Sequence, residues 1–152
     1  MAKKEVVSHW IFEGKPLLEL PEDMPGGFVY RMTCERTGQQ YIGKKNCYSR
    51  RRLKPLKGKK RHRIVIKESD WKTYSSSSKY VKAMIAEGDV FTHEIILFSP
   101  NKTENNYAEL VIQVKENVLQ ELLEDGTRKY LNENIAMRYY ASEKHSSFRE
   151  TL

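Results

Sequence analysis

The stretch GGFVYRMTCERTGQQYIGKKN, residues 26–46, decides the fold that this sequence predicts. Residues 28–35 alternate in the manner of a strand, the following Arg-Thr-Gly is a turn sequence, and residues 39–45 form a second strand-like run. The stretch therefore predicts an antiparallel hairpin. Tyr30 and Tyr41 lie eleven positions apart on its two strands, which raises the question of whether they are only hairpin residues or a catalytic pair.

The segment after the hairpin is basic and less regular. Residues 46–54 predict a short basic helix, which Pro55 ends because proline has no amide hydrogen to donate. Residues 56–63 are typical of a positively charged loop, and residues 64–66 form a short apolar stretch.

The second half predicts two helices around a buried strand. A serine before KYVKAMIAEG suits a helix N-cap, and Gly88 suits the helix end. Residues 90–98 have the β-branched and aromatic composition of a buried third strand, in which His93 is a packed or surface residue rather than a ligand. A long helix to about Leu123 follows, and residues 130–140 close the fold. The long helix has a stripe of apolar residues that predicts its core face: Tyr107, Leu110, Val111, Val114, Val118 and Leu122.

Length and element order indicate one domain of the α+β class. A chain of 152 residues can bury a single core. The elements predict a small three-stranded antiparallel sheet flanked by helices. We expect an extension over residues 1–25 that forms a short strand or covers the core, a domain over residues 26–140, and a polar tail over residues 141–152.

The cysteines and the apolar runs bear on the environment of the protein. Cys34 and Cys47 share no metal-ligand spacing with the histidines, so we expect reduced, structural thiols. The amino terminus lacks the apolar run of a signal peptide, and no stretch approaches the roughly 20 apolar residues that span a bilayer. These features predict a cytoplasmic protein with no membrane partner.

Positive charge is concentrated in one segment. The chain carries a formal net charge of +7, yet residues 44–63 alone hold eleven Lys and Arg side chains and no carboxylate. A polyanion relieves the self-repulsion of such a block, and counterion release from nucleic-acid phosphates gives the block its affinity. Nucleic acid is the expected partner, and a solvated loop, a nuclear-localisation patch or an anionic-lipid surface are the alternatives. The residues expected to contact nucleic acid are Gly43, Lys45, Arg50, Arg52, Lys54, Lys57, Lys59, Lys60, Arg61 and Arg63.

The hairpin resembles that of the GIY-YIG nucleases, which carry glycine–hydrophobic–tyrosine on one strand and tyrosine–hydrophobic–glycine on the next. Tyr41-Ile42-Gly43 matches the second half, whereas Phe28 stands where the first half has its glycine. The resemblance covers about residues 26–136, and WKTYSSSSKYV resembles a stretch of phage-encoded members, which implies a host-cell cytoplasm. Three further family elements follow in order: Arg51, Glu109 and Asn134.

The resemblance implies a metal-dependent endonuclease that hydrolyses DNA phosphodiester bonds. Either Tyr30 or Tyr41 is implied as the general base, with the other holding the water or the phosphate. A free tyrosine has a pKa near 10, so the base needs cations nearby. Lys44 is implied to assist the base, and Arg51 offers a planar, permanently charged fork for the scissile phosphate. The choice between the two tyrosines stays open.

Glu109 is the implied metal ligand, with Mg²⁺ or Mn²⁺ as cofactor, because one carboxylate with waters and a phosphate oxygen suits Mg²⁺. On a helical projection, however, Glu109 lies opposite the apolar stripe, which is typical of a solvated face. Asn134 is implied to fix a phosphate or a tyrosine, and Asn132 is the alternative for that role.

The expected substrate is double-stranded DNA, cut by a monomer or a homodimer. A second hypothesis comes from a different class: a non-catalytic nucleic-acid-binding protein on the same scaffold. Nicking of plasmid DNA distinguishes the two, because only the enzyme breaks phosphodiester bonds.

Overall fold

The hairpin of residues 26–46 forms the centre of the molecule, in a computed structural model that describes residues 7–141. β3 (Gly27–Cys34) and β4 (Gln40–Asn46) pair antiparallel, with Tyr30 opposite Gly43. Gly38 in the turn adopts a φ of 77°, which glycine reaches without a steric penalty. The predicted hairpin is confirmed.

The sheet has more strands than the sequence predicted. β7 (Phe91–Ser99) pairs antiparallel with the other side of β3, which confirms the third strand. β1 (Ile11–Phe12) then pairs parallel with β7, and β2 (Lys15–Pro16) pairs antiparallel with β1. The prediction of a three-stranded antiparallel sheet was therefore wrong. The sheet is five-stranded and mixed, in the order β2-β1-β7-β3-β4, because the residues before the hairpin pair with the free edge of β7.

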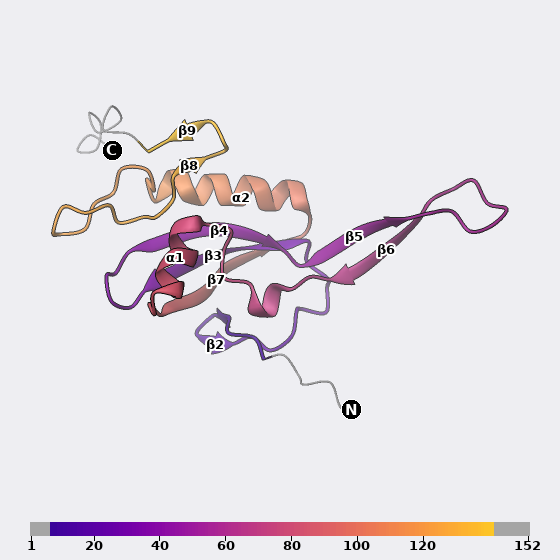
Figure 1. Ribbon diagram of the computed structural model, residues 1–152, viewed down its shortest axis with the longest axis horizontal. Coiled ribbons are helices and arrows are strands. Elements are labelled where there is room, and N and C mark those ends of the chain that lie inside the picture. The colour runs from indigo at the N-terminus through magenta and orange to yellow at the C-terminus, as the bar shows by residue number, and fades with distance from the viewer. Residues whose placement is uncertain (1–6, 142–152) are drawn as a thin grey trace.

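Two helices cover opposite faces of this sheet. α2 (Lys102–Lys115) lies along one face (Figure 1), with Asn101 as its N-cap. The 3₁₀ helix η1 (Trp71–Thr73) and α1 (Lys79–Ala86) pack against the other face. Ser78 caps α1 by accepting a hydrogen bond from the Val81 amide, as the sequence predicted. A short hairpin of β8 (Asn134–Ile135) and β9 (Tyr139–Tyr140) lies beyond α2.

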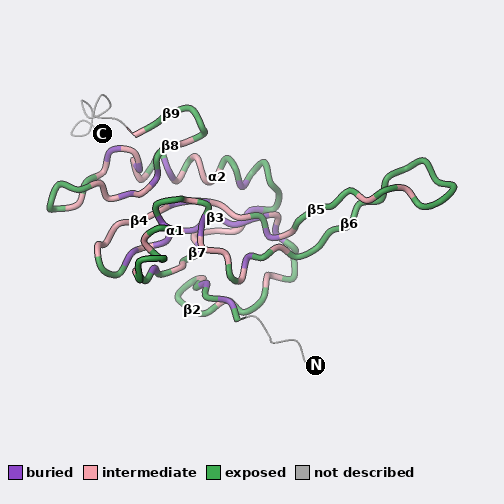
Figure 2. Tube along the Cα trace, viewed as in Figure 1, coloured by how far each residue is buried: buried purple, intermediate pink, exposed green. Residues whose placement is uncertain are grey.

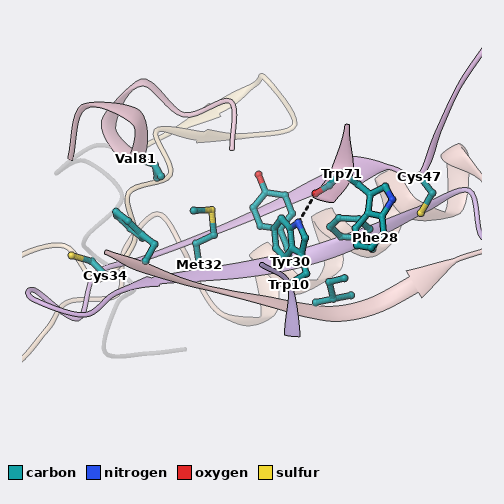
Figure 3. Packing of buried hydrophobic residues seen from close by; sticks show 10 residues of the cluster. Trp10, Phe28, Tyr30, Met32, Cys34, Cys47, Trp71 and Val81 are labelled. Carbon is teal, nitrogen blue, oxygen red and sulfur yellow. Dashed lines mark hydrogen bonds between the residues drawn. The ribbon is translucent and has the colours of Figure 1, made fainter. Parts of the chain in front are cut away.

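The alternation of side chains along β3 divides the core in two. Phe28, Tyr30, Met32 and Cys34 point to the face of η1 and α1, where they pack with Trp10, Trp71 and Val81 (Figure 3). The Trp10 indole donates a hydrogen bond to the Trp71 carbonyl at 2.5 Å, which ties the N-terminal segment to η1. Under α2 lies a smaller cluster of four buried residues, which are Val29, Ile42, Val118 and Tyr130.

α2 is shorter than predicted and turned about its axis. It ends at Lys115, because Asn117 adopts a φ of 50°, so the predicted extension to Leu123 was wrong. The predicted core stripe was wrong for four of its six residues, among them Tyr107, which is 69% exposed, and Val114, which is 60% exposed, whereas Val118 is buried beyond the end of the helix. The helix instead buries Asn105 and Gln113, whose side-chain amides donate hydrogen bonds to the backbone carbonyls of Phe28 and Ile42. Buried carbonyls require such partners, and this requirement overrides the apolar pattern.

The basic segment forms a two-stranded ribbon rather than a helix. β5 (Tyr48–Leu53) pairs antiparallel with β6 (Arg63–Glu68), so the predicted helix over residues 46–54 was wrong. The β-branched run Ile64-Val65-Ile66 explains the difference, because it favours a strand and offers a partner for the arginine run. The ribbon extends away from the sheet (Figure 1) and is exposed along most of its length (Figure 2).

Three other expectations can be compared with the described residues. Cys34 and Cys47 are buried free thiols, as predicted. His93 is a half-buried residue of β7, which also agrees with the prediction. Neither helix within residues 7–141 has the length and apolar character that crossing a bilayer requires. The predicted polar tail, apart from Ala141, lies outside the described residues.

Candidate active site

A pocket of about 460 Å³ opens beside β4, the outermost strand on one side of the sheet. At such an edge, side chains from both faces of the sheet can meet. Tyr41 is the ladder partner of Met32 and shares the face of Tyr30, whereas Lys44 is the partner of Val29 and shares the face of α2. The residues that line the pocket include Tyr41, Lys44, Ser77, Glu109, Gln113 and Asn134.

The two phenols approach each other because residue 43 has no side chain. A Cβ added at Gly43 would lie 2.6 Å from the Tyr30 hydroxyl and 2.8 Å from Cε1 of Tyr41. The ring centroids of Tyr30 and Tyr41 are 6.2 Å apart. The missing side chain of Gly43 leaves space for the two phenols. Because Gly43 is buried, it offers little surface to nucleic acid.

The two tyrosines differ in their access to solvent. Tyr30 is 1% exposed and lies in the row of buried side chains along β3 (Figure 3), whereas Tyr41 lines the pocket. Burial raises the pKa of Tyr30 well above its ordinary value, and the neighbouring Tyr74 adds to this rise. Burial also raises the pKa of Tyr41, while hydrogen bonding from Ser77 acts in the opposite direction. Both phenols are therefore protonated at neutral pH, and Tyr41 is the one that a substrate can reach.

Glu109 faces the pocket rather than the solvent, which corrects the expectation of a solvated face. Its side chain is 21% exposed, and its Oε1 lies 3.8 Å from Nζ of Lys44. Burial raises the pKa of Glu109, and the charge of Lys44 lowers it. Lys44 also donates a hydrogen bond to Oδ1 of Asn106 at 2.5 Å. The Lys44 ammonium thus contacts two side chains of α2, Glu109 and Asn106. A further cation in the pocket would stabilise the ionised form of Glu109.

The two candidate asparagines have different positions. Asn132 is 2% exposed, and its amide both accepts a hydrogen bond from the Ile42 amide at 3.2 Å and donates one to the Ile42 carbonyl at 2.8 Å. This pairing satisfies the outer edge of β4 in the way that a neighbouring strand would. Asn134, on β8, is half-buried and lines the pocket without a comparable backbone bond within the described residues.

The sequence analysis missed three residues near the phenols. The ring of Tyr74 is 6.0 Å from that of Tyr30, centroid to centroid. Ser76 and Ser77 hydrogen-bond with the phenols, Ser76 with Tyr30 and Ser77 with Tyr41. The signal was the stretch WKTYSSSSKYV, in which only the helix cap had been assigned from the residues themselves. The cap falls to Ser78, and the preceding residues contact the site.

The structure does not bring Arg51 into this pocket. Arg51 lies on β5 opposite Val65, and it lines a separate hollow of the ribbon with other residues that include Arg50, Arg52 and His62. Arg51 is therefore separate from the pocket of Tyr41 and Glu109, because residues 48–53 form a strand that leads away from β4. The cations that line the Tyr41 pocket within the described residues are Lys44 and Lys79.

The other predicted nucleic-acid contacts divide into two groups. Lys45 forms an ion pair with Asp70 at 2.5 Å, and its hydrogen bond lowers the pKa of that carboxyl group. Its Nζ also lies 4.1 Å from the centroid of the Tyr74 ring, so it belongs to the sheet rather than to the ribbon surface. The remaining cations lie on the ribbon and its tip, and all of them are exposed: Arg50, Arg52, Lys54, Lys57, Lys59, Lys60, Arg61 and Arg63.

The pocket fits a metal ion that needs few protein ligands. Within residues 7–141, no three His, Cys, Asp or Glu side chains are grouped to hold a metal. Mg²⁺ keeps most of its waters and is commonly held by one or two carboxylates with substrate phosphates. Glu109 offers one partly buried carboxylate in a pocket open to a phosphate, which matches this donor set.

A comparison with known families gives a match over most of the chain. A family model described as "Putative endonuclease segE, GIY-YIG domain" matches residues 10–135. The matched range includes the sheet with β1 and β2, both helices, the ribbon and the pocket lining except Ala136 and Met137. Neither a curated protein nor a solved structure matches the chain.

Proposed function

We propose, from the premise that this chain belongs to the GIY-YIG endonuclease family, that it is a metal-dependent endonuclease that hydrolyses phosphodiester bonds of double-stranded DNA. The observation that carries the proposal is the pocket that Tyr41 and Glu109 share, with Nζ of Lys44 3.8 Å from the Glu109 carboxylate. A phosphodiester, a water molecule and a carboxylate-bound cation can meet there.

Tyr41 is the tyrosine that we assign to the attacking water. The assignment is supported by its place in the pocket, because Tyr30 is 1% exposed and cannot contact a substrate without rearrangement. Tyr41 first loses its phenolic proton to solvent, and the phenolate then takes a proton from the water as the water oxygen bonds to phosphorus; the leaving oxygen of the broken P–O bond takes a proton from solvent. Burial raises the pKa of Tyr41, and every cation near the pocket stabilises the phenolate that acts as the base.

Tyr30 has a positioning role in this proposal. Its ring supports Tyr41 from the core, with a centroid distance of 6.2 Å, and Ser76 hydrogen-bonds with it. Lys44 and Lys79 attract the scissile phosphate, and Asn134 contacts it. Arg51 contacts a neighbouring phosphate from the ribbon, so its loss should weaken substrate binding more than turnover.

Glu109 would hold the metal, Mg²⁺ or Mn²⁺. When bound, such an ion supplies Lewis-acid charge to the phosphoryl oxygens. Glu109 supplies the negative charge that keeps a cation in the pocket, and Lys44 restrains the carboxylate from the side of β4.

Plasmid nicking with Mg²⁺, and with chelator in its place, tests the proposal. Glu109→Gln and Tyr41→Phe should each lower the nicking rate by about 10²-fold or more while DNA binding persists, because each loses a group that acts on the reacting atoms. Glu104→Gln is the matched control: Glu104 is exposed in the first turn of the same helix and should retain full activity. Chelator-resistant nicking, or a fully active Glu109→Gln, would contradict the proposal.

The position of Arg51 outside the Tyr41 pocket favours a second candidate function, a DNA-binding protein without turnover. In that case the ribbon would bind DNA while the pocket lacks the guanidinium that the family resemblance implied. A gel shift by the wild-type protein with no nicking in Mg²⁺ or Mn²⁺ would select this candidate.

A further inference from the structure

The ribbon carries charge that the rest of the molecule does not compensate. Residues 48–68 contain ten Lys and Arg side chains and one carboxylate, Glu68. Glu68 is held at the base, where it accepts a hydrogen bond from the Trp71 indole at 2.5 Å. Within residues 7–141, none of the ten cations forms an ion pair, whereas ion pairs hold Arg31, Arg36, Lys44, Lys45, Lys72 and Lys79 elsewhere.

Both faces of the ribbon mix cations with apolar side chains. Directly opposed residues of an antiparallel ladder share a face. Arg50 therefore lies beside Ile66 and Arg52 beside Ile64 on one face, while Arg51 lies beside Val65 on the other. Ile64 and Ile66 are each 57% exposed, and Val65 is 44% exposed. An isolated two-stranded ribbon is marginally stable in water, so these exposed side chains indicate a partner.

A second copy of the chain is a poor partner for this surface. Edge-to-edge pairing would bring two ribbons with nine net positive charges each into contact, and such charges oppose pairing. A polyanion complements the charge of the ribbon. When the partner is a nucleic acid, release of counterions from its phosphates favours binding.

Chemistry and size then distinguish among nucleic acids. Single strands are bound by aromatic side chains on which bases stack, whereas Tyr48, half-buried at the base of the ribbon, is the one Phe, Tyr or Trp within residues 48–68. The major groove of A-form RNA is too narrow for side chains to read. The major groove of B-DNA is about 12 Å wide and admits a two-stranded ribbon. Six paired residues on each strand give the ribbon a paired length of about 20 Å, enough to follow the groove over several base pairs.

The base of the ribbon is fixed beside the candidate active site. Ser69 donates from its amide to the Cys47 carbonyl at 2.9 Å and from its hydroxyl to the Asn46 carbonyl at 2.7 Å. The Cys47 amide in turn donates to the Gly26 carbonyl at 3.1 Å. Cys47 is buried and follows β4 directly, only three positions after Lys44. A duplex held by the ribbon would therefore be positioned relative to the pocket.

We propose that the β5–β6 ribbon is an arm that lies in the major groove of B-form DNA and holds the duplex beside the Tyr41–Glu109 pocket. The second part of this statement rests on the proposed endonuclease function, whereas seating of the ribbon in the groove does not. Arg50 and Arg52, with the isoleucines beside them, face the base edges and contact guanine O6 and N7 or the thymine methyl group. Arg51, on the opposite face, and the cations of the tip contact the flanking phosphates.

Binding measured in chelator, where no cleavage occurs, tests the arm with the full chain. The probes are a DNA duplex of about three helical turns, one of its strands alone, and the RNA duplex of the same sequence. The triple variant Arg50→Gln, Arg51→Gln, Arg52→Gln should bind the DNA duplex at least about 10-fold more weakly at physiological salt, and its log–log salt slope should fall by up to about 3. The matched control replaces three exposed lysines away from the ribbon, Lys15, Lys82 and Lys115, by Gln and should bind much more tightly than the ribbon variant.

Methylation of the duplex by dimethyl sulfate identifies the groove. Wild-type protein should protect guanine N7, which lies in the major groove, and leave adenine N3 of the minor groove reactive. The triple variant should lose the N7 protection, and thermal unfolding should show that it keeps its fold. A second variant, in which Asn-Gly replaces residues 50–66, should lose both duplex binding and protection.

Several results would overturn the proposed arm in the major groove. They are protection of adenine N3 alone, unchanged N7 reactivity, equal affinity for single strands or duplex RNA, or a loss of DNA affinity in the lysine control equal to that of the arginine variant. The endonuclease proposal fails on other grounds, through nicking by Glu109→Gln. Each proposal can therefore fail while the other stands.

Discussion

The chain contains two antiparallel hairpins in succession, and they are stabilised in different ways. The β3–β4 hairpin is part of the five-stranded sheet, with both faces of β3 buried, and its side chains belong to both core clusters. The β5–β6 hairpin pairs with no other strand in the described part of the chain, and every residue of β6 is exposed. Apolar residues occur in both, so apolar content alone does not decide burial. What differs is the surface that covers them.

The largest expected effect concerns the removal of one large apolar side chain from each hairpin. Phe28→Ala should lower the free energy of unfolding by about 3–5 kcal/mol, because Phe28 is fully buried between Trp10 and Trp71. Ile66→Ala, on the exposed ribbon, should change it by less than about 0.5 kcal/mol. Urea denaturation measures both. A loss at Ile66 comparable to that at Phe28 would mean that the ribbon packs on the body in solution.

A glycine in each hairpin gives a second, smaller contrast. Gly43→Ala places a methyl group against both phenols and should cost about 1–3 kcal/mol, together with most of the nicking activity. Gly58→Ala has no atom to collide with, and it only strains the tip at a φ of 82°. Its melting temperature and activity should therefore stay close to wild type. If Gly43→Ala kept full activity, the close approach of Tyr30 and Tyr41 would not matter for catalysis.

The pH dependence of stability gives the smallest effect and involves the sheet alone. Burial, followed by the neighbouring His9, lowers the pKa of His93 to about 4. In the unfolded chain His93 binds a proton near pH 6.5, whereas in the folded chain it does so only near pH 4. The free energy of unfolding therefore decreases as the pH drops from 6.5 to 4. The loss should be about 1–2 kcal/mol, reduced by the partial exposure of the ring.

Denaturant midpoints at several pH values, for wild type and His93→Gln, measure this effect. The variant should have a flatter profile between pH 6.5 and pH 4. An unchanged profile would assign the pH dependence to other groups, such as His9, whose ring is 3.7 Å from His93 between centroids.

The sequence by itself determined the features that depend on neighbouring residues. The strand alternation and turn of residues 26–46, the Ser78 cap and the third strand all follow from local backbone preferences. The pairing of Tyr41 with Glu109 as site residues came from the resemblance to a family, and the structure brings both side chains into one pocket.

Tertiary structure alone decided which surfaces meet. β1 and β2 joined the sheet because β7 had a free edge, and α2 buries Asn105 and Gln113 beside Ala108 and Ile112 because carbonyls of Phe28 and Ile42 needed donors. Arg51 lies outside the pocket because residues 48–53 pair with the strand that contains Ile64-Val65-Ile66. In each case the deciding group lies far along the chain, and its hydrogen-bonding or packing demand exists only once the fold has formed.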